Sequence, residues 1–96
     1  MEFTRQNPSA RIVVPDKITV RQQLEYFSES RLPTKPVFER LWAGALPLIL
    51  DWECSLMPDK NTNLDTVTNP DITSVVIWAG VKVKEYIDGL DLIEKN

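Results

Sequence analysis

An almost wholly apolar stretch lies at the centre of the chain. Residues 41–50 read LWAGALPLIL, and the Trp42 indole is their one side chain able to form a hydrogen bond. Ten helical residues span about 15 Å, half the thickness of the hydrocarbon core of a bilayer. The stretch therefore predicts a buried helix and no membrane span. Its apolar surplus for a chain of 96 residues also hints at a protein partner.

The apolar positions around this stretch predict a central helix over about residues 36–57. One helical face repeats at intervals of three or four residues and comprises Val37, Leu41, Ala45, Leu48, Trp52 and Leu56. Pro47 removes the hydrogen bond to the Ala43 carbonyl and should kink this helix. A break there into two shorter helices is the alternative.

Capping residues predict the starts of two further helices. Thr19 and Gln22 have the spacing of a capping box, which predicts a helix over about residues 20–31. The apolar side of that helix would hold Val20, Leu24 and Phe27.

The third helix is predicted over about residues 70–88. Asn69, Pro70 and Asp71 supply a capping side chain, a proline that needs no N–H, and a carboxylate in the first turn. The β-branched run from Val75 to Ile77 could instead form a strand, but the helical period continues to Leu90 and favours the helix.

Residues 1–18 show no helical period and contain two prolines, so they predict an extended N-terminal arm. Ala10 to Val14 could pair as an edge strand, although it cannot form a stable sheet alone. The expected fold class is therefore all-α, a small three- to four-helix bundle over residues 19–96 that follows the arm. Its central helix would be kinked at Pro47. The tail after residue 90 should fray.

Charge and composition narrow the choice of partners. The apolar fraction of 43% and the charged fraction of 26% are typical of a globular domain, and the net charge of −3 disfavours nucleic-acid binding. All five arginines precede residue 41, while acidic residues prevail after it. This split permits head-to-tail association into a homo-oligomer. Without an early apolar run that could serve as a signal peptide, we expect an intracellular protein.

Few residues suggest chemistry. The chain has no histidine, no glycine-rich phosphate loop and one cysteine, so we expect no enzyme, no cofactor and no metal site. Cys54 should be a small, half-buried apolar residue. Acidic and amide residues alternate from Asp59 to Asp65 as in a calcium loop, but Leu64 and Pro70 stand where glycine and glutamate are required.

The tripeptide Trp-Ala-Gly occurs at residues 42–44 and again at residues 78–80. Its small residues would let two helices approach closely, which is the favoured interpretation. Alternatively, aromatic and apolar side chains would line a groove for an apolar helix of a partner. The candidate partner-binding residues are Phe38, Trp42, Leu46, Ile49, Trp52 and Trp78.

The order of helices and aromatic residues resembles that of small phage and prophage tail assembly chaperones. The matching pieces are Gln22–Phe27, Phe38–Trp42, Asp51–Cys54, Asn69–Asp71, Ile77–Gly80 and Lys95–Asn96. The resemblance implies a non-enzymatic protein of the bacterial host cytoplasm that binds hydrophobic helices of the tape measure protein. It would keep those helices soluble until tail protein polymerises around them.

Two other functions stay open. The carboxylates between Asp51 and Glu94 could imitate phosphates, as in an acidic inhibitor or regulator of a host nucleic-acid enzyme. Alternatively, the protein is a structural subunit of the phage particle.

Overall fold

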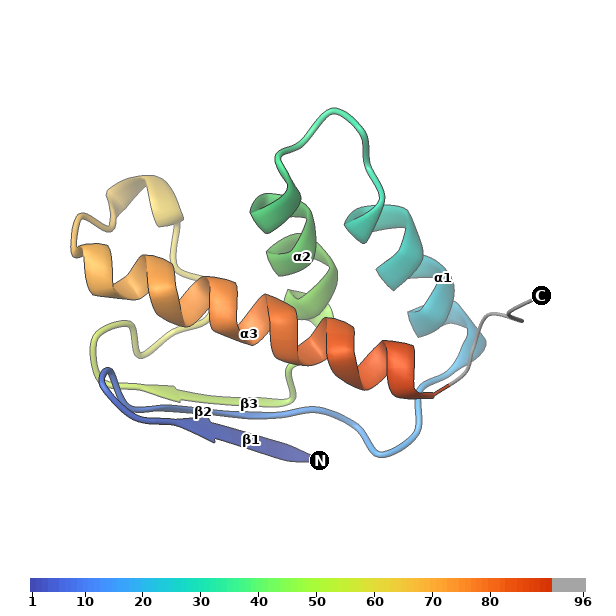
Figure 1. Ribbon diagram of the computed structural model, residues 1–96, viewed down its shortest axis with the longest axis horizontal. Coiled ribbons are helices and arrows are strands. Elements are labelled where there is room, and N and C mark those ends of the chain that lie inside the picture. The colour runs from blue at the N-terminus through green and yellow to red at the C-terminus, as the bar shows by residue number, and fades with distance from the viewer. Residues whose placement is uncertain (91–96) are drawn as a thin grey trace.

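Three helices lie on one side of a three-stranded antiparallel sheet (Figure 1). The computed structural model describes residues 1–90. In chain order the elements are β1 (Glu2–Arg5), β2 (Ala10–Val13), α1 (Val20–Ser30), α2 (Val37–Ala45), the 3₁₀ turn η1 (Leu46–Leu48), β3 (Asp51–Cys54), the 3₁₀ turn η2 (Leu64–Thr66) and α3 (Pro70–Gly89). The fold class is α+β, so the prediction of an all-α bundle is wrong.

The N-terminal residues are part of the sheet and not a separate arm. β1 and β2 form a hairpin, and β2 is the central strand, paired antiparallel with β1 on one side and β3 on the other. Ala10, Ile12 and Val14 are buried, while Arg11 and Val13 alternate with them. This two-residue period suits a strand with one covered face. The sequence had suggested an edge position for it at most.

The central helix is less than half as long as predicted. α2 ends at Ala45, η1 contains Pro47, and the chain then turns into β3. In β3, Trp52 and Cys54 are buried and Asp51 and Glu53 are exposed. The strand period was overlooked because Trp52 also fits the helical spacing. The alternative of two shorter helices is wrong as well, since the second segment is a strand.

A lysine holds the chain where the helix stops. The Lys60 Nζ donates hydrogen bonds to the Leu46 carbonyl oxygen at 3.1 Å and to the Ile49 carbonyl oxygen at 2.7 Å. The end of a helix leaves carbonyl groups without intrahelical partners. Lys60 supplies donors to two carbonyls in the turn that redirects the chain from α2 to β3.

The bounds of α1 and α3 agree with those predicted from the sequence to within one residue. Thr19 and Gln22 form the predicted capping box, and the Asn69 side chain accepts a hydrogen bond from the Asp71 N–H at the start of α3. The run from Val75 to Ile77 is helical. Of the predicted apolar side of α1, Phe27 packs against the core as expected. The prediction is wrong for Val20 and Leu24, which are exposed, and it missed Tyr26, the buried residue of the helix.

Both Trp-Ala-Gly tripeptides lie at close helix contacts, which confirms their structural interpretation. A Cβ atom at Gly44 would lie 3.0 Å from the Tyr26 ring of α1. One at Gly80 would lie 3.0 Å from the Leu41 Cβ atom and 3.3 Å from the Trp42 backbone nitrogen. The two glycines therefore set the spacing of α2 from its neighbours on both sides.

Within residues 1–90, none of the helices combines the length and the apolar character needed to cross a membrane. The predicted frayed tail lies outside the described residues, as do the Lys95–Asn96 pair of the resemblance and the carboxylate of Glu94.

We expect Gly80→Val to lower the free energy of unfolding by about 1 to 3 kcal/mol, because the added side chain overpacks the contact with α2. Urea unfolding measures the change. Gly89→Val is the matched control, since a Cβ atom there meets nothing within 4 Å. Equal effects of the two substitutions would contradict the proposed close contact.

Candidate functional site

An open apolar groove lies between α2, the first half of α3 and the loop that contains η2. Its volume is about 260 Å³. The residues that line it are Phe38, Glu39, Trp42, Leu64, Val67, Asn69, Ile72, Thr73, Val76 and Ile77. The groove brings together two parts of the chain that are separate in the sequence, residues 38–42 of α2 and residues 64–77 of the η2 loop and α3.

Helical spacing places the lining side chains. Phe38 and Trp42 are four residues apart on α2, as are Ile72 and Val76 on α3, so each pair lies on one side of its helix. Trp42 and Ile72 are buried, whereas Phe38 is 51% exposed and Leu64 is 38% exposed. The groove thus combines a buried apolar base with an accessible aromatic ring.

The polar groups of the groove are few. Glu39 is the one charged side chain among the described lining residues, and the Asn69 side chain is engaged in capping α3. The volume also falls below the roughly 300 to 1,000 Å³ usual for small-molecule sites. Such a groove suits apolar side chains from a protein better than a substrate that must be oriented by hydrogen bonds.

Two of the six predicted partner-binding residues line this groove, namely Phe38 and Trp42. Ile49 and Trp52 are buried in the core, and Leu46 is half-buried against it. The apolar surplus of residues 41–50 is therefore mostly covered within the chain, although Leu50 is 64% exposed.

Trp78 holds β1 against α3 and lies outside the groove. The Arg5 guanidinium lies 5.8 Å from the centre of the Trp78 ring, and its Nη1 donates to the Ser74 carbonyl oxygen at 2.9 Å. The cation–π contact and the hydrogen bond join two elements far apart in sequence.

Sequence reasoning missed the opposite wall of the groove. The predicted partner-binding residues did not include Leu64 and Val67 of the η2 loop or the lining residues of α3. Two apolar residues in an otherwise polar loop were an available signal. Only the tertiary structure shows that they face α2 across the groove.

Turn chemistry accounts for the calcium-like loop. The Asp59 carboxylate accepts from the Asn61 N–H at 2.9 Å, and the Asn63 side chain accepts from the Asp65 N–H at 3.0 Å. Among residues 1–90, no three His, Cys, Asp or Glu side chains are grouped as a metal site would require. Cys54 is buried on the covered face of the sheet.

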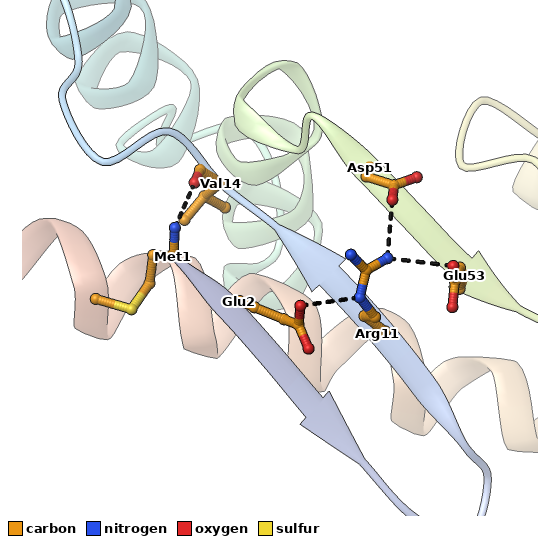
Figure 2. Close-up of polar contacts among 6 residues, drawn as sticks. All are labelled: Met1, Glu2, Arg11, Val14, Asp51 and Glu53. Carbon is orange, nitrogen blue, oxygen red and sulfur yellow. Dashed lines mark hydrogen bonds and ion pairs between the residues drawn. The ribbon is translucent and has the colours of Figure 1, made fainter.

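Arg11 gathers three carboxylates on the open face of the sheet. Its Nε lies 3.1 Å from Glu2, and its Nη1 lies 2.8 Å from Asp51 and 3.2 Å from Glu53 (Figure 2). The strand register sets Arg11 opposite Glu53, with Glu2 and Asp51 diagonal to it. One guanidinium thereby links all three strands.

The hydrogen bond from Arg11 favours the charged form of Asp51 and holds the pKa of that carboxyl below its usual range. A depressed pKa in the folded state means that ionised Asp51 stabilises the fold above its unfolded pKa of about 3.9. This contribution disappears as the pH falls through the lower pKa of the folded state.

We expect Arg11→Met to reduce stability at neutral pH, because three carboxylates would remain close together without a cation. The difference from the unmodified protein should shrink as the pH falls through the lowered pKa of Asp51, because protonated Asp51 no longer gains from the Arg11 charge. Urea unfolding across the acid range measures it. Lys84→Met is the control, because Lys84 is paired with a single carboxylate on one helix face. If the loss of stability in Arg11→Met did not depend on pH, Arg11 would not act through these carboxylates.

Comparison of this chain with protein-family models, with curated proteins and with solved structures found no match.

Proposed function

We propose that this chain is a non-enzymatic phage or prophage protein that binds apolar helical segments of a partner in the groove beside α2. The partner class is the tape measure protein, and the role is that of a tail assembly chaperone in the cytoplasm of the bacterial host. The single observation that carries the binding role is the open groove, with Phe38 half exposed above the buried Trp42.

Helix-in-groove recognition explains how such a groove would work. A partner helix that presents apolar residues at intervals of three or four positions can insert successive side chains between α2 and α3. Phe38 and Leu64 would lose their contact with water, and each Å² of apolar surface removed from water contributes roughly 25 cal/mol. Recognition by apolar contact tolerates many sequences, as a chaperone for long hydrophobic helices requires.

The acidic inhibitor is less well supported. Asp51 and Glu53 are paired with Arg11, and Glu85 and Asp88 are paired with lysines of α3. Arg11 offsets one of the three negative charges around it, and the two lysines offset those of Glu85 and Asp88, so cations interrupt the negative surface that a basic enzyme would meet. A structural subunit of the particle could use the same groove, but it would be found in purified virions, where a chaperone would be absent.

Binding should be visible in tryptophan fluorescence, because Trp42 lines the groove. Adding a peptide that contains an apolar tape measure helix should shift the emission and give saturable binding. Phe38→Gln should weaken this binding roughly tenfold or more, since the exposed ring supplies the main accessible apolar area.

Leu50→Gln is the control, because Leu50 is 64% exposed but does not line the groove. It should bind the peptide as the unmodified protein does. Failure of the peptide to bind, or equal losses in the two variants, would rule out the groove as the chaperone site.

A further inference from the structure

The apolar stripe of α1 is uncovered in the single chain. Val20 is 69% exposed and Leu24 is 66% exposed, and the spacing of four residues places them about 40° apart around the helix. The capping box at Thr19 fixes where α1 begins, and Tyr26 anchors its other side in the core. The exposed pair is thus held in place on an ordered helix.

Basic residues border this stripe. Arg31 lies within about 20° of the line from Val20 to Leu24, and Arg21 follows one residue after Val20. The Arg31 guanidinium lies 4.8 Å from the centre of the Phe27 ring, which fixes it beside the apolar surface. Glu25 follows Leu24 as Arg21 follows Val20 and lies about 40° farther round the helix, so two arginines and one glutamate border the stripe and the net charge of this border is positive.

The groove beside α2 has the complementary character. It is apolar, it is open, and its charged lining residue is the acidic Glu39. Asp65 adds a second exposed carboxylate next to Leu64. An apolar stripe with a positive border therefore matches an apolar groove with a negative border.

A single chain cannot bring the two surfaces together. In Figure 1, α1 lies on one side of α2 and the η2 loop lies on the other. The groove is on the η2 side, because Leu64 and Val67 line it. The close contacts at Gly44 and Gly80 hold α2 between its neighbours. The stripe of one chain can therefore reach only the groove of another.

We propose that the occupant of the groove in the free protein is α1 of a second copy of this chain. The contact is heterologous, so each copy offers one stripe and one groove, and copies add in series or close into a ring. The proposal rests on the groove of the proposed function but does not require the tape measure protein. Self-association would keep both apolar surfaces covered until a partner helix competes for the groove.

Mixing two defective variants tests this arrangement. Leu24→Gln damages the stripe and Phe38→Gln damages the groove, and each residue is exposed, so neither change should affect folding. Sedimentation velocity should show concentration-dependent assembly of the unmodified protein. Each variant alone should have a dissociation constant raised roughly tenfold or more.

Together, the two variants should form a one-to-one dimer that grows no further, because one intact stripe meets one intact groove. Leu50→Gln, outside both surfaces, should assemble normally. Three results would overturn the proposal: an unmodified protein that stays monomeric at all concentrations, variants that assemble normally, or two defective variants that do not complement each other. Failure of the two variants to complement each other would indicate a symmetric contact, in which the same surface of both copies meets.

The same variants separate this proposal from the chaperone role. Leu24→Gln keeps an intact groove, so it should bind a tape measure peptide even though it no longer self-associates. If the unmodified protein assembles and Leu24→Gln does not, but neither binds the peptide, the chaperone proposal fails and the self-association stands. If Leu24→Gln binds the peptide but the unmodified protein stays monomeric, the self-association fails and the chaperone proposal stands.

Discussion

The contact between Trp42 of α2 and Trp52 of β3 joins the helical layer to the sheet. Their ring centres lie 5.6 Å apart in an edge-to-face arrangement, the geometry that aromatic pairs prefer. The Trp52 indole also donates to the Met57 carbonyl oxygen at 2.6 Å, which satisfies its buried polar atom. A sheet of three short strands needs such a cover, because it is not stable with both faces in water.

The groove follows from how α2 is held. Gly44 and Gly80 allow close neighbours, while the turn at Pro47 sends the chain away into β3. The first turn of α2, with Phe38, therefore projects beyond the region packed by α1 and α3, and the η2 loop encloses it only in part. The side chains that stabilise the base of the groove belong to the core, so binding there draws on a surface already in place.

The two uncovered apolar surfaces are best understood together. Val20 and Leu24 occupy the side of α1 that the sequence predicted to be buried, yet the core accepts Tyr26 instead. A local pattern that disagrees with the monomeric fold is costly unless a partner satisfies it. The groove of a second copy would cover Val20 and Leu24, whereas a partner helix in the groove would cover Phe38 and leave these two residues exposed.

The sequence allowed the prediction of interactions between residues close together in the chain, but not of pairing between distant segments. The caps at Thr19 and Asn69 act within three residues, so the starts of α1 and α3 followed from the residues themselves. β3 could not be identified in this way, because its four residues are stabilised by β2, about forty positions earlier. Phe38 and Trp42 were among the predicted partner-binding residues, but the groove that they line also requires Leu64 and the residues of α3 across from them. The sequence alone determined where helices begin; the tertiary structure decided which apolar faces are covered, because strand pairing and helix packing join residues that no local pattern connects.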